Sequence, residues 1–268
     1  KRDKKMLNFI VPAMTHIRYF VPLVIEGNLR GLQSKFFLGP CNSKYNSIVK
    51  NKEELLDIVQ KNNIKIFPIE NLTNHEGLTF QIEGDGWNPR LDSLINQKLS
   101  KQKTIALTYM SDFAHSFNYV DRVDSVVFPS KKFAVFHNCV SKKNVYLGSP
   151  KYDLKLGSRE EICKKYGLNS NDSFALYVAP KNSFSGKIDH DVIINSLRKK
   201  GKKVICKSRL KDHISYSEKF DYLFYDVTWH PHTTLELLKI ADLMINFNST
   251  TIKEAVLSRV PLIDIKAK

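Results

Sequence analysis

Short apolar runs alternate with amphipathic segments along most of the chain. Apolar runs of four to eight residues are typical of buried strands, and apolar residues at helical spacing are typical of helices packed on a sheet. In the first half, the pattern predicts helices at 17–32, 52–61 and 91–99 and strands at 6–11, 35–38, 64–68, 78–83, 104–109, 125–128 and 144–147. Strands that alternate with helices in this way predict a parallel sheet covered on both faces.

The same alternation begins again in the second half. Gly148, Ser149 and Pro150 form a predicted turn that can continue neither a strand nor a helix, and the domain boundary is therefore placed there. The sequence predicts an α/β fold with two domains, residues 1–148 and 149–268. In the second domain it predicts helices at 158–166, 189–199 and 233–240 and strands at 174–178, 203–207, 222–225, 243–245 and 260–265.

Small polar residues separate the last two strands of the second domain. Asn248, Ser249, Thr250 and Thr251 lie between a predicted strand and the first turn of a predicted helix, where free backbone N–H groups favour an anion. Glu254 lies three residues after Thr251, which is also the spacing of a capping box. The spacing alone leaves an anion site and a structural helix cap both open.

The run ADLMINFNSTTIKEAVLSRVPLIDI at 241–265 resembles the nucleotide-binding half of GT-B glycosyltransferases. The shared pattern is an aspartate after a helix, an apolar strand, small Ser/Thr residues, a helix opening with Glu-Ala, and a proline-led strand. The segment GSPKYD at 148–153 is similar to a stretch in glycerophosphotransferases and UDP-GlcNAc 2-epimerase-like proteins of the same superfamily. The likeness covers roughly 104–265 and is strongest at 233–265.

The resemblance implies two Rossmann-like domains that face each other across a cleft, with a nucleotide-sugar bound to the second. Ser249 and Thr250 would contact the donor's diphosphate, and Glu254 would accept hydrogen bonds from the ribose hydroxyls. The implied activity moves a sugar from a nucleotide-sugar, UDP-sugar first and GDP-sugar next, to a hydroxyl of a glycan or lipid-linked acceptor. No metal or cofactor is implied beyond that donor.

Two other activities of the superfamily remain open. One is a nucleotide-sugar 2-epimerase-like isomerase, although the His-Arg-x-Glu-Asn pattern of those enzymes is absent from 179–189. The other is a CDP-glycerol-type glycerophosphotransferase acting at a membrane, with which the basic charge of the chain is compatible. A basic nucleic-acid binder without enzymatic activity is a third reading, and no strand interleaves aromatic and basic residues as such a binder would require.

Glycosyl transfer needs a group that stabilises the departing nucleoside diphosphate and a base that takes the acceptor's proton. For the first task the candidates are Lys181, Lys207 and Arg209 in loops that follow predicted strands, with Trp229 as a surface for the nucleobase. For the base the candidates are Asp112 with His115, and then His16, all after strands of the first domain. Ordinary surface or lid roles remain the alternative for each of these residues.

The resemblance places base recognition in the loop at 226–232, which includes Asp226. Thr233 and Glu236 have the spacing of another capping box, so Glu236 is assigned a structural role only.

Composition limits the partners. The chain has 42 Lys+Arg against 27 Asp+Glu, a net charge of +15, which favours an anionic ligand and permits peripheral contact with a membrane. Four widely spaced cysteines without metal-ligand spacing indicate a reduced, cytoplasmic protein without structural zinc. Asp189-His190-Asp191 has the form of a metal-binding DxD motif, but its place before a predicted helix favours an N-cap at Asp189.

Overall fold

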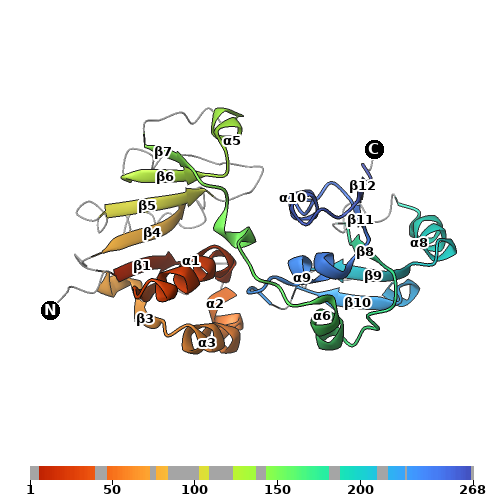
Figure 1. Cartoon of the computed structure of the whole chain (residues 1–268), viewed down its shortest axis with the longest axis horizontal. Helices are drawn as coiled ribbons and strands as arrows, with labels where there is room; N and C mark the ends of the chain where they lie inside the picture. The colour runs from red at the N-terminus through yellow and green to blue at the C-terminus, as the bar shows by residue number, and fades with distance from the viewer. Residues whose placement is uncertain are drawn as a thin grey trace. The chain divides into compact units, whose positions relative to one another are not determined.

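The computed structural model describes residues 6–39, 47–72, 77–83, 103–108, 123–136, 143–180, 188–209, 217–226 and 228–266. The chain divides into two compact units, Lys1–Asp153 and Leu154–Lys268. Each unit is an α/β structure built on its own parallel sheet (Figure 1). No described helix has the length and apolar character needed to cross a membrane.

The first unit contains a sheet of seven described strands in the order β3-β2-β1-β4-β5-β6-β7, all parallel. Its elements are β1 (Met6–Val11), η1 (Met14–His16), α1 (Ile17–Leu29), β2 (Gln33–Leu38), α2 (Ser47–Lys50), α3 (Lys52–Lys61), β3 (Lys65–Pro68), η2 (Ile69–Asn71), β4 (Leu78–Glu83), β5 (Lys103–Thr108), β6 (Ser125–Phe128), α5 (Lys131–Phe136), β7 (Asn144–Tyr146) and η4 (Pro150–Tyr152). The predicted strands at 6–11, 78–83 and 125–128 are confirmed at the predicted bounds. The predicted helix at 91–99 lies outside the described residues.

Phe9 is the centre of the first unit's core. Its ring is fully buried and lies 5.1 Å from the ring of Phe20 on α1, 5.6 Å from Phe36 on β2 and 5.2 Å from Phe80 on β4. Because residues paired across parallel strands point to the same face, this one row of side chains joins three strands to the helix above them. Helix α1 ends before Gly31, whose φ of +73° reverses the chain toward β2.

The second unit contains five described parallel strands in the order β10-β9-β8-β11-β12. Its elements are α6 (Arg159–Tyr166), β8 (Phe174–Val178), α8 (His190–Lys199), β9 (Lys203–Ser208), η5 (Ser217–Lys219), β10 (Tyr222–Tyr225), α9 (Thr233–Ile240), β11 (Leu243–Asn246), α10 (Ile252–Leu257) and β12 (Leu262–Asp264). The strand order reverses between β8 and β11. Such a switch point is where open α/β sheets bind their ligands, beyond the carboxyl ends of the strands.

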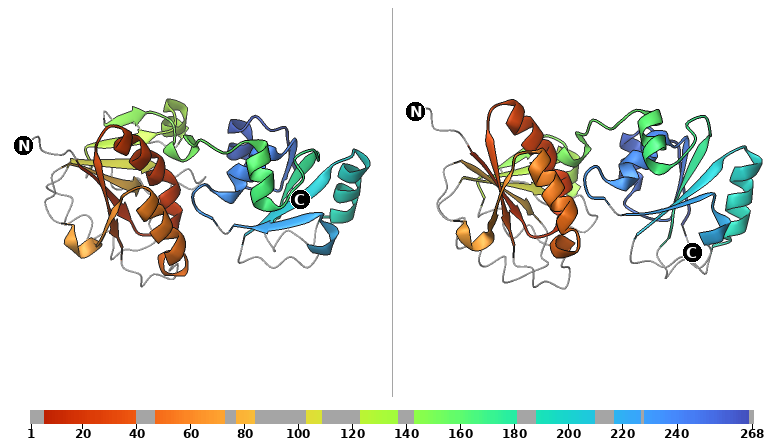
Figure 2. Two further views of the ribbon diagram at one scale, coloured as in Figure 1. Left: turned by 60° about the horizontal axis from the view of Figure 1, so that its bottom comes forward. Right: turned by 90° about the horizontal axis from the view of Figure 1, so that it is seen from below.

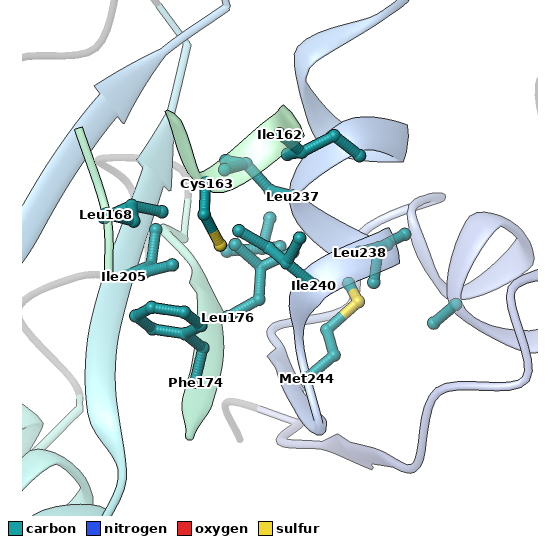
Figure 3. Close-up of a cluster of buried hydrophobic side chains, with 12 residues drawn as sticks. Ile162, Cys163, Leu168, Phe174, Leu176, Ile205, Leu237, Leu238, Ile240 and Met244 are labelled. Carbon is teal, nitrogen blue, oxygen red and sulfur yellow. The ribbon is translucent and has the colours of Figure 1, made fainter. Parts of the chain in front are cut away.

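Helices cover both faces of the second sheet (Figure 2). Alternate residues of β8 point to opposite sides: Leu176 enters a cluster with α6, α9 and α10, whereas Tyr177 enters a cluster with α8. Figure 3 shows the first of these clusters, in which Leu237 and Ile240 of α9 meet Ile162 of α6 above the strands. Because both faces are buried, the strands read as continuous apolar runs, which explains why the sequence pattern located them.

Asp189 caps α8 as predicted, and α6 has a capping box that the sequence analysis did not predict. Ser158 and Glu161 form a reciprocal capping box on α6, and the Asp189 side chain accepts from the Val192 N–H at 3.1 Å at the start of α8. The predicted capping box of Thr233 and Glu236 is wrong, because His232 is the N-cap of α9 and makes no side-chain cap bond.

Glu236 serves a tertiary contact instead. Its carboxylate accepts two hydrogen bonds from Lys165 Nζ, at 2.8 and 2.7 Å, and one from the Tyr166 hydroxyl at 2.7 Å. Burial and this hydrogen bond to Glu236 raise the pKa of Tyr166. The carboxylate therefore ties α6 to α9, and the expectation that Glu236 has a structural role holds through a different contact.

The segment that follows the predicted domain boundary at Gly148 packs on the first unit. Element η4 lies against α1, with Lys151 buried and its Nζ 5.7 Å from the centre of the Tyr19 ring. The division into compact units accordingly falls after Asp153.

Candidate functional site

The carboxyl ends of β8, β9, β10 and β11 carry most of the predicted binding residues of the second unit. Register places Val178 of β8 beside Lys207 of β9, and Asn246 of β11 beside Asp264 of β12. These four residues lie at one edge of the sheet, at the switch point and on either side of it. Two polar groupings form there, one in the loop between β11 and α10 and one at the ends of β9 and β10.

The loop between β11 and α10 is fixed by Asp264. Its Oδ1 accepts from Asn246 Nδ2 at 2.7 Å and from the Asn248 N–H at 3.1 Å. Asn248 adopts a φ of +49°, a left-handed conformation that asparagine tolerates better than most residues. The Asn246 amide also donates to the Ser249 carbonyl at 3.1 Å. The loop backbone is therefore held at two points, the Asn248 N–H and the Ser249 carbonyl.

Ser249 and Thr250 keep their backbone N–H groups unused within the described structure. The adjoining N–H groups are engaged: that of Asn248 donates to Asp264, and that of Thr251 donates to Ser249 Oγ at 3.5 Å. Two adjacent amide donors at the end of a strand are suited to bind an oxyanion. The predicted contact of Ser249 and Thr250 with a diphosphate stays a prediction.

The predicted alternative role of Thr251 and Glu254, a capping box, is not what the structure contains. Thr251 is the N-cap of α10 but makes no side-chain cap bond, because its hydroxyl donates to Asn246 Oδ1 at 3.0 Å. Glu254 lies on the first turn of α10 and is buried. A buried carboxylate beside unused amide donors remains a candidate ligand group.

The second grouping is an ion cluster of Lys207, Asp226 and His232. Lys207 is almost fully buried at the end of β9, and its Nζ lies 2.5 Å from Asp226 Oδ2. The other carboxylate oxygen, Oδ1, lies 3.5 Å from His232 Nε2. Oδ1 is buried and has no hydrogen bond in the described structure. The ammonium group of Lys207 is therefore already neutralised by a carboxylate, which the sequence did not indicate.

The segment between β10 and α9 brings Trp229 and two histidines to the same edge. Trp229 forms an isolated antiparallel bridge with His232, and their rings lie 6.1 Å apart. Burial lowers the pKa of His230 to about 4, so its imidazole is neutral at pH 7. Thr228 Oγ1 donates to the Pro231 carbonyl at 3.0 Å, which closes this segment onto itself. Trp229 is partly exposed there.

The remaining predicted site residues are dispersed. Arg209 is partly exposed just after β9. His16 lies in the first unit at the start of α1, is 1% exposed and packs edge-on against the Phe20 ring at 6.2 Å. Lys181, Asp112 and His115 lie outside the described residues. The structure thus brings Ser249, Thr250, Glu254, Lys207, Arg209 and Trp229 to the carboxyl edge of one sheet.

Each residue of the segment Asp189-His190-Asp191 contacts another residue of the second unit. Asp189 caps α8, His190 Nδ1 lies 2.5 Å from the Tyr177 hydroxyl, and Asp191 pairs with Lys219 at 2.7 Å. Among the described residues, no group of three or more His, Cys, Asp or Glu side chains could hold a metal ion.

Sequence reasoning missed the residues that hold the site together. Asn246 and Asp264 are polar residues at the ends of apolar strands, and a polar residue ending a buried strand is the signal that could have located them. Asp226 was considered only as part of a base-recognition loop. Its pairing with Lys207 depends on the neighbouring position of β9 and β10, which no local pattern specifies.

Neither a protein-family model nor a curated protein matches this sequence. Solved structures do match it over 97% of its length. One is ADP-heptose LPS heptosyltransferase II of E. coli, at 11% identity, a TM-score of 0.53 and 84% of that chain covered. A second is a protein from Listeria monocytogenes described as a putative UDP-N-acetylglucosamine 2-epimerase, at 11% identity, a TM-score of 0.61 and 78% covered. A third is the wall teichoic acid polymerase TagF, at 12% identity, a TM-score of 0.61 and 69% covered.

These likenesses extend through both units of the chain and agree with the two parallel sheets. The chain has the GT-B fold. The predicted α/β fold class is confirmed, and membership of the predicted superfamily stays a prediction. Within the GT-B fold, the grouping around Ser249, Thr250 and Glu254 lies in the second α/β unit, at the carboxyl edge of its sheet.

Proposed function

We propose that this chain is a glycosyltransferase that binds a nucleotide-sugar on its second unit and transfers the sugar to a hydroxyl acceptor. The observation that carries the proposal is the β11–α10 loop, in which Ser249 and Thr250 present adjacent unused amides beside the buried carboxylate of Glu254. Heptosyltransferase II and TagF, which have this fold, support a transferase.

The amides and the carboxylate suit different parts of one donor. Backbone N–H groups held in place by Asp264 would stabilise the charge that develops on a departing diphosphate, without reorganising during the reaction. A buried carboxylate accepts hydrogen bonds only, which fits the two hydroxyls of a ribose. Arg209 would add a positive charge at the same edge, and Trp229 a ring face for the base. The transfer would be metal-independent and a UDP-sugar the first donor to test, followed by a GDP-sugar.

In this proposal the first unit binds the acceptor and supplies the catalytic base that takes its proton. Asp112 and His115 are its first candidates for the proton acceptor. His16 is the weaker one, because its imidazole is buried against Phe20 and a general base must reach the proton that it removes. A glycan or lipid-linked hydroxyl in the cytoplasm, including one at a membrane surface reached through the basic charge of the chain, is the proposed acceptor.

A second candidate is a glycerophosphotransferase with a CDP-linked donor. It is favoured by the TM-score of 0.61 to TagF, one structure of which was obtained with CDPG. The same loop would bind the diphosphate of this donor. The two functions therefore differ in the nucleobase of the donor and in the group that is transferred. A 2-epimerase-like isomerase has equal support from the TM-score but lacks the sequence pattern of those enzymes at 179–189.

A thermal-shift and calorimetric screen of the full chain against UDP, GDP, CDP and their sugar or glycerol conjugates tests the proposal. A ligand that binds only the folded protein raises its melting temperature in proportion to the logarithm of its concentration. We expect a saturable shift with one of these diphosphates and its conjugate. A Ser249→Pro variant, which lacks one amide donor, should reduce that affinity. No shift with any nucleotide diphosphate would contradict the proposed function.

A further inference from the structure

The ion cluster of Lys207, Asp226 and His232 contains a buried carboxylate oxygen without a hydrogen bond. Asp226 Oδ2 is paired with Lys207 Nζ at 2.5 Å, but Oδ1, with less than 1 Å² accessible, has no hydrogen-bond partner in the described structure. A buried polar atom without a partner costs free energy, so such atoms need a physical explanation. His232 Nε2 lies 3.5 Å from Oδ1, just too far for a good hydrogen bond.

A proton on His232 would complete this cluster. The imidazolium can donate from both ring nitrogens, so Nε2–H could close onto Oδ1 with a small adjustment of the ring. The charge of the cluster would then change from zero, with one Lys207 cation and one Asp226 anion, to +1. The net charge is unfavourable in a site that is mostly buried, unless an anion lies beside it.

The cluster lies where a bound diphosphate would supply that anion. Lys207 on β9 and Asn246 on β11 flank the end of β8, so their backbones are two strand spacings apart, about 10 Å. The side chains of His232 and Asp226 are 12% and 17% exposed at this edge, whereas that of Lys207 is 5% exposed. His232 and Asp226 therefore both keep some access to solvent, and proton binding to His232 is the event that would add positive charge to the cluster.

We propose that binding of a nucleotide diphosphate at the carboxyl edge of the second sheet is coupled to protonation of His232, which Asp226 stabilises and Lys207 opposes. The inference rests on the proposed function, because it takes the diphosphate from there. Binding takes up a proton from solvent, which bonds to the His232 imidazole, and the imidazolium donates to Asp226 Oδ1. Lower pH therefore favours binding, and binding favours the protonated form by the same factor.

Other titratable groups lie close to this cluster and respond differently to pH. Tyr166 and Lys165 of α6 and Glu236 of α9 form a satisfied hydrogen-bonded group, and the burial and bonding that raise the pKa of Tyr166 keep its hydroxyl neutral. Burial lowers the pKa of His230 to about 4, so this histidine stays neutral between about pH 6 and pH 8. His232 is the group of this cluster expected to exchange a proton in that interval.

Isothermal titration calorimetry of the full chain in buffers with different ionisation enthalpies tests the coupling. The probe is a UDP-sugar or another nucleotide-sugar that the screen identifies, because its diphosphate lacks the terminal phosphate whose own titration would interfere. We expect a fraction of a proton to be taken up on binding near pH 7, and affinity to rise on the order of fivefold from about pH 8 to about pH 6. The wild-type measurement needs no variant and so does not depend on one that folds.

His232→Gln is the decisive variant, with His232→Asn as a second choice of similar polarity. Either should bind without proton uptake and with a pH-independent affinity close to that of the wild type at pH 8. His190→Gln, which removes a histidine elsewhere in the same unit, should retain the coupling. Binding without proton uptake, or coupling that persists in His232→Gln, would overturn this inference and leave the proposed function intact. No nucleotide binding at any pH would overturn both.

Discussion

Lys207 lies buried at the end of β9 with its ammonium nitrogen 2.5 Å from the carboxylate of Asp226. The side chain of Lys207 is 5% exposed and that of Asp226 is 17% exposed, so neither charge has water as its main partner. A buried pair of this kind is costly to break, because removal of one charge leaves the other uncompensated.

The Lys207→Met variant should lose about 3 kcal/mol of unfolding free energy for that reason. The double variant Lys207→Met/Asp226→Leu, which removes both charges, should recover more than half of the loss. Unfolding in urea measures the wild type, Lys207→Met, Asp226→Leu and the double variant. Lys202→Met is the control, because Lys202 and Asp242 form a more exposed pair at 3.4 Å whose loss should cost less than about 1 kcal/mol. Simple additivity of the two single losses at 207 and 226 would contradict the buried pairing.

The Glu254→Gln variant should separate ligand binding from helix stability. Thr251 makes no side-chain cap bond, so Glu254 has no capping box to complete. We expect nearly unchanged thermal stability and a weakening of nucleotide binding by about 1–3 kcal/mol, since a neutral amide is a poorer acceptor for two ribose hydroxyls.

The matched control for that variant is Glu161→Gln. Glu161 completes the capping box of α6 with Ser158, and glutamine can substitute for glutamate in such a box. Nucleotide affinity should therefore be unchanged in Glu161→Gln. Equal nucleotide affinity in Glu254→Gln and the wild type would show that Glu254 does not contact the ligand.

His230 should make the fold sensitive to acid. Burial lowers its pKa from 6.5 to about 4, so between these values the unfolded chain binds more protons than the folded one. Stability is then complete above about pH 6.5 and decreases as the pH falls toward 4.

The His230→Gln variant should lose less stability than the wild type on going from about pH 7.5 to about pH 5. We expect the difference between the two proteins to change by roughly 1–2 kcal/mol over that interval. Urea unfolding at each pH gives both free energies. A parallel pH dependence in the two proteins would show that the pKa of His230 is the same in the folded and unfolded states.

Chelation should leave the proposed transfer reaction unchanged. Asp189 and Asp191 have the spacing of a metal-binding DxD motif, but one caps α8 and the other pairs with Lys219. With the donor identified by the screen, activity should be equal in excess EDTA and in Mg²⁺. Asp189→Asn should also keep full activity, since asparagine is an equally good N-cap. Loss of activity on chelation, restored by a divalent ion, would contradict a metal-independent reaction.

The sequence pattern located elements whose signals are local. Phe174–Val178 is apolar at every position because β8 is covered on both faces, and Asp189 was recognisable as a cap because its partner, the Val192 N–H, lies three residues away. The Ser249-Thr250 loop was recognisable for a related reason, because small polar residues between an apolar strand and a helix form a contiguous motif.

Contacts between distant segments were not predictable in this way. The spacing of Thr233 and Glu236 favoured a capping box, but Glu236 instead binds Lys165, which is 71 residues away in the sequence. The spacing of residues along the chain gives no information on a distant cation that competes for the carboxylate. Lys207 was predicted as a phosphate ligand on charge alone, and only the parallel pairing of β9 with β10 brings Asp226 to neutralise it.

The sequence by itself determined the alternation of strands and helices, the α/β class and the motif that carries the resemblance, because burial on two faces and helix capping act over a few residues. The tertiary structure decided which charges meet. Asp264 reaches Asn246 and Asn248 because β12 lies beside β11, and Asp226 pairs with Lys207 because β10 lies beside β9. Electrostatic energy depends on distance in space, which the order of residues along the chain does not fix.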